Sequence, residues 1–117
     1  MSDKIKKGET GEILAAEFLQ QKGFAILEKN FRHGHQEIDL IATINNWLVF
    51  VEVKMRTNLK YGYPEVFVDR TKRRNIRNAA RQYIFKNDWK GNARFDVISI
   101  TINSTEPDIH HIEDAFY

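Results

Sequence analysis

The stretch EIDLIATINNWLVFVEVK, residues 37–54, constrains the fold of this chain more than any other segment. It contains two strongly apolar runs that meet at Asn45-Asn46, and asparagine accepts the positive φ of tight turns better than most residues. The segment therefore predicts a hairpin of two strands, residues 37–43 and 47–55. Both strands also carry charged residues, which are seldom buried unless they are paired or bind a metal.

The hairpin turn decides which charged residues face one another. Counting outward from the two asparagines places Asp39 opposite Glu52 and Glu37 opposite Lys54. Side chains alternate between the two faces of a strand, so all four stand on one face. Asp39 and Glu52 are then direct cross-strand neighbours, about 5 Å apart at Cβ.

Two carboxylates directly opposite each other destabilise an ordinary sheet. A hard divalent cation removes this penalty, because Mg²⁺ binds oxygen ligands at about 2 Å. Lys54 would lie close enough to a metal-bound phosphate to orient water or to offset developing charge. The pattern thus indicates a metal-dependent phosphodiester site. The alternative is an ion pair of Glu37 with Lys54, with Asp39 and Glu52 on a solvated sheet edge.

Two helices are expected from apolar periodicity. Residues 11–22 show core-facing spacing and end at Gly23, and Glu12 borders the apolar stripe of this helix. The second helix follows Asp69, a good N-cap, with apolar residues repeating at helical spacing over 76–84.

The remaining strands are apolar runs bounded by turn residues, at 24–30, 94–102 and 109–116. The turns between elements are expected at 32–36 and 103–108, and a loop at 57–64. The order α-β-β-β-α-β-β predicts an α/β fold, a mixed sheet flanked by helices. Residues 1–117 are expected to form a single domain, since the length suits one core but not two.

Composition excludes several classes of protein. The chain has no cysteine, so neither a disulfide framework nor a cysteine-based zinc site can form. The 42% hydrophobic and 29% charged residues are typical of an ordinary globular protein. The first residues contain no apolar run like that of a signal peptide, and no stretch is long enough to span a bilayer. A cytoplasmic location and no membrane partner are therefore expected.

Positive charge is concentrated in one segment, although the net charge is only +2. Seven basic residues occur between positions 70 and 86 with no acidic residue among them: Arg70, Lys72, Arg73, Arg74, Arg77, Arg81 and Lys86. Such a stripe is the electrostatic footprint expected for a phosphate backbone. A solvated helix face is the alternative.

The four histidines do not form an evident metal site. His33 and His35 lie in a glycine-containing turn and are expected to be exposed, with phosphate contact as an alternative role. His110 and His111 are adjacent in a strand, point to opposite faces and cannot act as a joint pair of ligands.

Several motifs resemble a known family. GETGEILAAEFLQQKGFAILEKNFR, EIDLIA, LVFVEVKMR and GYPEVFVDRTK resemble the YraN-like family of small bacterial proteins, from about Gly8 to Tyr83, and RFDVISI extends the match weakly. Asp39 followed by Glu52-Val53-Lys54 looks like the PD-(D/E)XK nuclease signature on the restriction-endonuclease-like fold. The family is itself similar to archaeal Holliday-junction resolvases.

The resemblance implies roles for individual residues. The family's acidic helix residue falls on Glu12 and its metal aspartate on Asp39. Its Glu-x-Lys pair falls on Glu52 and Lys54, and its lysine before the second helix falls on Lys72. It also implies Mg²⁺ or Mn²⁺ as cofactor, DNA as partner and a homodimer. One departure is Gln36, where the family usually has a glycine; glutamine requires an ordinary backbone there and narrows the approach to Asp39.

The leading hypothesis is a Mg²⁺-dependent endonuclease that hydrolyses branched or junction DNA. Asp39 and Glu52 would hold the metal, with Glu12 as an outer or additional ligand, and Lys54 would position or activate the water. The phosphate contacts would come from the second helix: Lys72, Arg73, Arg74, Arg77 and Arg81. Two alternatives stay open, a non-catalytic nucleic-acid-binding module on a nuclease scaffold and an assembly factor whose acidic cluster is structural.

Overall fold

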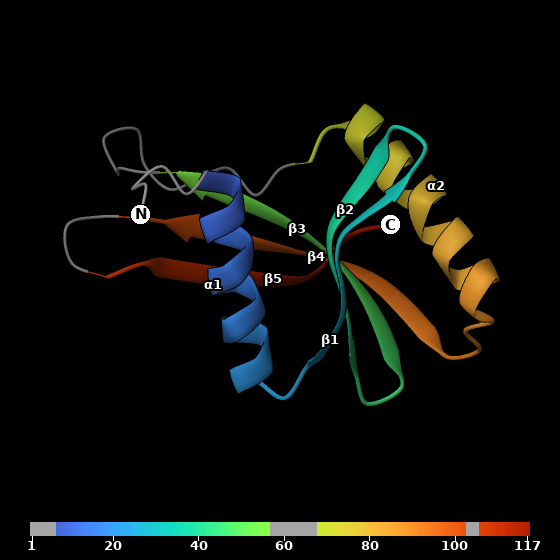
Figure 1. The fold of residues 1–117 in the computed structure, drawn as a ribbon, viewed down its shortest axis with the longest axis horizontal. Helices are drawn as coiled ribbons and strands as arrows, with labels where there is room; N and C mark the ends of the chain where they lie inside the picture. Colours follow the sequence, from blue (N-terminus) through green and yellow to red (C-terminus); the bar gives the residue numbers. More distant parts are fainter. Residues whose placement is uncertain (1–6, 57–67, 103–105) are drawn as a thin grey trace.

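The computed structural model describes residues 7–56, 68–102 and 106–117, with side chains from residue 10 onward. Its elements follow the predicted order: α1 (Lys7–Gln21), β1 (Ala25–His33), β2 (Gln36–Ile44), β3 (Trp47–Arg56), α2 (Arg70–Asn87), β4 (Asn92–Thr101) and β5 (Asp108–Phe116) (Figure 1). The expected loop at 57–64 and half of the expected turn at 103–108 lie outside the described residues.

The five strands form one sheet in the order β1-β2-β3-β4-β5. Strands β3 and β4 pair in parallel and the other neighbours pair antiparallel, which confirms the predicted mixed sheet. A parallel pair needs a crossover connection, and α2 supplies it. Helix α1 covers one face of the twisted sheet and α2 the other (Figure 1). The arrangement is consistent with a restriction-endonuclease-like α/β fold.

The β2–β3 hairpin has the predicted register. Its pairs run from Ile44 with Trp47 to Leu40 with Val51, and Asn45 has a φ of 55°. Strand β4 docks at this turn, because the backbone N–H of Asn92 donates to the Asn46 carbonyl at 3.0 Å.

The segment before β4 passes so close to this turn that it requires a glycine. A Cβ added at Gly91 would lie 2.7 Å from the carbonyl oxygen of Asn46, closer than real Cβ atoms come to backbone. The hairpin turn therefore also fixes the point at which the parallel strand begins.

One expected boundary was wrong. Residues 32–36 were expected to form a turn, but β1 continues through His33 and β2 begins at Gln36. The turn is therefore only Gly34 and His35, and Gly34 has a φ of 64°, a left-handed conformation that glycine adopts at no steric cost.

Alternation along the strands gives the sheet two apolar cores. Val49 and Val51 of β3 pack in the α1 core, whereas Leu48 and Phe50 pack in the α2 core. Helix α2 contributes four buried residues to its core: Ile76, Ala79, Ala80 and Tyr83. Because Glu52 follows Phe50 by two positions, it continues the face of the sheet that α2 covers.

The helix ends follow the expected signals. Asp69 is the N-cap of α2, and its side chain accepts a hydrogen bond from the backbone N–H of Lys72 at 2.8 Å. Gly23, just after α1, has a φ of 99°. Within the described ranges, no helix is both long enough and apolar enough to cross a membrane.

A buried ionic network, not anticipated from the sequence, joins β4 and β5. Asp96 is fully buried; it accepts hydrogen bonds from Arg94 Nε at 3.0 Å and from the backbone N–H of Asp114 at 2.9 Å, and pairs with His111 Nε2 at 2.7 Å. Burial raises the pKa of Asp96, but the hydrogen bonds from His111, Arg94 and Asp114 outweigh it and hold the pKa below its ordinary value.

On the side of His111 away from Asp96, the Lys22 ammonium lies 2.6 Å from the imidazole Nδ1. The network therefore reaches from β4 across β5 to the end of α1. His110 is exposed whereas His111 is largely buried, which confirms that the two adjacent histidines point to opposite faces.

Replacing Ile76 by Asp should separate α2 from the sheet. Ile76 is 2% exposed, so the new carboxylate would be buried without a partner, and the free energy of unfolding should fall by about 4 kcal/mol or more. Urea denaturation followed by circular dichroism measures this. Phe85→Asp is the matched control, because Phe85 is 85% exposed on the same helix and should change stability little. Equal losses in both variants would contradict the packing of α2 described above.

Candidate metal and nucleic-acid site

Asp39 and Glu52 lie at the end of the regular β2–β3 pairing, one step beyond Leu40 and Val51. The Asp39 carboxylate reaches across to β3, where its Oδ2 accepts a hydrogen bond from the backbone N–H of Val53 at 2.8 Å. The carboxylate thus takes the place of a backbone acceptor where the ladder ends. This bond was not anticipated from the sequence, although the predicted register brings the two strands together at this point.

The electrostatics of Asp39 reflect a second carboxylate close by. Burial, followed by the negative charge of Glu52, raises the pKa of Asp39 from 3.8 to about 7. The Val53 hydrogen bond and the positive charge of Lys72 lower this pKa, and Glu37 raises it slightly. The predicted neighbourhood of two carboxylates is therefore present, and the charged form of Asp39 is costly in the protein alone.

Glu52 has one satisfied and one unsatisfied oxygen. Its side chain is 10% exposed, and Oε2 lies 3.4 Å from the Lys72 ammonium at the start of α2. Its Oε1 is buried and has no hydrogen-bond partner among the residues that the structure describes. A buried carboxylate oxygen without a partner is costly, and buried groups of this kind mark places where an ion or a ligand is to be expected.

These features fit a magnesium ion. Mg²⁺ is commonly held by one or two carboxylates, with water and substrate phosphate oxygens completing its shell. Asp39 and Glu52 supply two such carboxylates, and Oε1 of Glu52 needs a partner. The described part of the chain contains no group of three or more His, Cys, Asp or Glu side chains that could hold a metal.

The other expected site residues divide between the two faces. Glu12 is half-buried on α1, on the opposite side of the sheet from α2, and does not form a three-carboxylate group with the pair; its role as an outer ligand stays a prediction. Lys54 is half-buried two positions after Glu52. Glu37 lies 3.7 Å from Arg32 of β1, an ion pair that the predicted register did not include.

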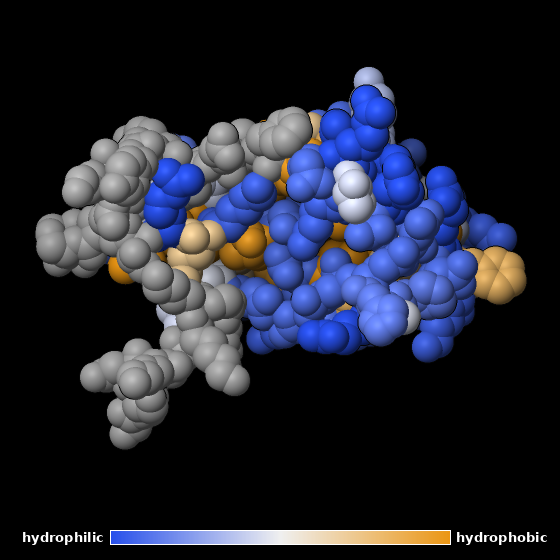
Figure 2. Space-filling model, turned by 90° about the horizontal axis from the view of Figure 1, so that it is seen from above, coloured by the Kyte–Doolittle hydropathy of each residue, from blue (hydrophilic) through white to orange (hydrophobic). Residues whose placement is uncertain are grey.

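The basic residues of α2 are mostly exposed, and several of them have partners within the protein, as Lys72 does in Glu52. Arg74 is exposed and Arg73 is half-buried. Arg77 donates to the carbonyl oxygen of Tyr117 at 2.9 Å, and Arg81 donates to Oδ1 of Asn78 at 2.9 Å. Seen from above, hydrophilic residues cover most of the half of the molecule that carries α2 (Figure 2).

Fold and site together define an α/β protein with a largely buried carboxylate pair beside a basic helix. The pair lies at the end of the β2–β3 hairpin that is opposite its turn. The chain belongs to the family described as "Uncharacterised protein family UPF0102", whose model matches residues 11–100. This confirms the YraN-like family expected from the sequence motifs.

Similar proteins come from several bacteria. A UPF0102 protein of Cytophaga hutchinsonii is 48% identical over 99 residues, 85% of this chain and 88% of the relative. One of Flavobacterium psychrophilum is 42% identical over 117 residues, 100% of this chain and 98% of the relative. One of Persephonella marina is 46% identical over 111 residues, 94% of this chain and 92% of the relative.

The variant Asp39→Asn should be more stable than the wild type at high pH when no metal is added. Because the pKa of Asp39 is higher in the folded protein, protonation of this carboxyl stabilises the fold. This stabilisation is complete below about pH 3.8 and is lost as pH rises through about 7. Asparagine does not titrate and has no such loss. The free energy of unfolding of the variant should therefore exceed that of the wild type by about 2 kcal/mol at pH 8, since each pKa unit represents about 1.4 kcal/mol and solvent reduces the effect.

Urea denaturation at pH 5 and pH 8 tests this difference. Added Mg²⁺ should stabilise the wild type at pH 8 by mass action and should leave Asp39→Asn unaffected. A variant no more stable than the wild type at pH 8 would show that Asp39 is not part of a desolvated acidic pair.

Proposed function

We propose that this protein is a metal-dependent endonuclease that hydrolyses phosphodiester bonds of DNA, with branched or junction DNA as its substrate. The observation that carries the proposal is the Asp39–Glu52 pair: the raised pKa of Asp39, and an Oε1 of Glu52 that has no partner among the described residues, fit a bound cation. The resemblance of these residues and of Glu52-Val53-Lys54 to the PD-(D/E)XK signature supports it. The similarity of the family to junction resolvases supports the branched substrate and a homodimer.

Each residue of the proposed site has a separate task. Asp39 and Glu52 would hold Mg²⁺ or Mn²⁺, which when bound polarises the phosphate and offsets the charge that develops on it. Lys54 would position the water whose oxygen attacks phosphorus in line, while the bond to the leaving sugar oxygen breaks. Lys72 lies against Glu52 at the start of α2, where its ammonium can also contact a phosphate oxygen.

The exposed side of α2 would hold the nucleic-acid backbone. Its arginines lie on one element beside the acidic pair, and arginine matches the geometry of phosphate oxygens. Contacts to phosphates position a duplex without reading its sequence. We therefore expect binding that depends on DNA structure and salt more than on sequence.

A non-catalytic nucleic-acid-binding protein is the second candidate. Two observations favour it: the described residues include no group of three potential metal ligands, and Lys72 already lies against Glu52. Titration with Mg²⁺ and Mn²⁺ in the presence of duplex, branched and single-stranded DNA separates the candidates. Cleavage of branched DNA supports the endonuclease, and salt-sensitive binding without cleavage under either ion supports the second candidate.

Glu52→Gln should abolish cleavage and retain DNA binding. Glutamine keeps the size of the side chain but removes the negative charge that the metal requires, so cleavage should fall by at least about a hundredfold. Gel assays of cleavage and fluorescence anisotropy of binding measure the two properties on the same branched DNA. Full cleavage by this variant would refute the assignment of Glu52 as a metal ligand.

Arg74→Ala should flatten the salt dependence of DNA binding. Each phosphate neutralised on duplex DNA contributes about 0.9 to the slope of log affinity against log salt, so losing one contact should reduce the slope by about that amount. Arg74 is exposed, and its removal leaves the Arg77–Tyr117 hydrogen bond in place, so it tests the basic stripe without disturbing the C-terminal contact.

Lys90→Ala is the control for net charge. It removes one positive charge from an exposed residue beyond α2 that pairs with Asp88. The slope should stay unchanged in this variant. An unchanged slope in Arg74→Ala as well would make the basic stripe an ordinary solvated face.

A further inference from the structure

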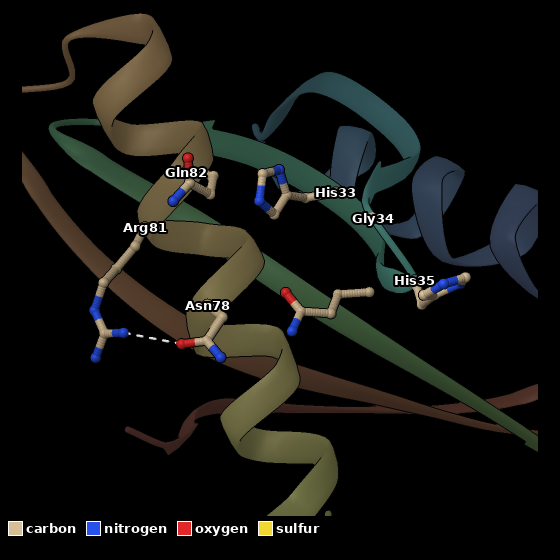
Figure 3. Close-up of a pocket in the computed structure, with 7 residues that line it drawn as sticks. His33, Gly34, His35, Asn78, Arg81 and Gln82 are labelled. Carbon is tan, nitrogen blue, oxygen red and sulfur yellow. Dashed lines mark hydrogen bonds between the residues drawn. The ribbon is translucent and has the colours of Figure 1, made fainter.

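A pocket lies between the β1–β2 turn and α2. This pocket has a volume of about 400 Å³ and is lined by seven residues: His33, Gly34, His35, Gln36, Asn78, Arg81 and Gln82 (Figure 3). The volume is in the range of sites that hold small organic ligands. None of the lining residues carries a carboxylate, so the pocket does not repel a ligand that is attached to phosphate.

The lining is suited to a flat polar ring. Three of the seven residues are carboxamides, and a carboxamide offers a donor and an acceptor side by side, as the edge of a nucleobase does. A bare phosphate, in contrast, would favour a lining dominated by cations. The single guanidinium, that of Arg81, is engaged with Asn78.

The Arg81–Asn78 hydrogen bond orients one of the carboxamides. Guanidinium groups only donate, so the Asn78 atom that faces Arg81 is the carbonyl oxygen, at 2.9 Å. The NH₂ group of Asn78 is then the donor that remains for a ligand. On the other wall, the His33 ring points from the end of β1 toward α2, on the side where Gln82 lies (Figure 3). An imidazole ring in this place can stack on a base.

The pocket lies at a defined spacing from the acidic pair. Gln36 precedes Asp39 by three residues of β2, which is about 10 Å along a strand. Lys72 contacts Glu52 of the acidic pair, and Asn78 follows Lys72 by six residues of α2, which is about 9 Å along a helix. Both paths give a distance of about three nucleotides, since one strand of a duplex advances about 3.4 Å per nucleotide.

We propose that this pocket binds one unpaired nucleobase of the nucleic-acid strand that the acidic pair would cleave, about three nucleotides from the cleaved bond. The inference rests on the proposed function and adds a substrate requirement to it. A base enters such a pocket only when it is free of its partner, because a paired base presents its edge inside the duplex. The site therefore selects DNA with an unpaired nucleotide near the cleavage point, such as a branch.

Moving a single abasic nucleotide along one arm of a cleavable branched DNA tests the proposal. Anisotropy should show one position, about three nucleotides from the cleaved bond, at which loss of the base weakens binding about fivefold or more, and neighbouring positions should have little effect. Gln82→Ala, an exposed position on α2, should weaken binding of the intact strand and remove the penalty at that position. Gln36→Gly, which removes the carboxamide from the other wall, should do the same.

Gln20→Ala is the matched control, an exposed glutamine on α1 far from the pocket, and it should keep the full penalty. A flat abasic profile on DNA that is bound and cleaved, or a penalty that persists in Gln82→Ala, would overturn the pocket assignment alone. Failure of every DNA to bind would overturn the proposed function and the pocket assignment with it.

Discussion

The register of the β2–β3 hairpin is the constraint on which the rest of the structure depends. The turn at Asn45-Asn46 sets it, and β4 starts its parallel pairing from the same turn, through the hydrogen bond between Asn92 and Asn46. Because side chains alternate, a slip of one residue would place Glu52 in the α1 core and move Val51 to the α2 face. Apolar packing on both faces therefore holds the carboxylates in position.

In the described part of the chain, the fully buried Asp96 and the largely buried Asp39 have opposite electrostatic character. Asp96 is surrounded by donors, and its pKa is below the ordinary value; its charge is part of the structure that joins β4 to β5. Asp39 has one backbone donor and an acidic neighbour, and its pKa is raised to about 7. A satisfied carboxylate stabilises a fold, whereas a costly one persists where a ligand compensates for it. This contrast, and not burial alone, makes Asp39 and Glu52 the candidate functional pair.

Sequence patterns predicted what alternation and helix periodicity determine. The element order, the hairpin register, the N-cap at Asp69 and the apolar stripe of α2 depend on residues close together in the chain, and the structure confirms them. Contacts between distant segments were missed, because no local pattern encodes them. The pairing of Lys72 with Glu52 and of Asp96 with His111, and the pocket formed by the β1–β2 turn and α2, belong to this group.

The positions of Lys22 and Asp96 indicate which nitrogen of the His111 ring accepts a hydrogen bond and which one donates. An ammonium group can only donate, so the Nδ1 that it approaches at 2.6 Å is the acceptor nitrogen of the ring. The ring proton then resides on Nε2 and is donated to Asp96, which makes the two ends of the imidazole unequal. The imidazole thus accepts on the side of α1 and donates on the side of β4, so one side chain of β5 links the end of a helix to a neighbouring strand.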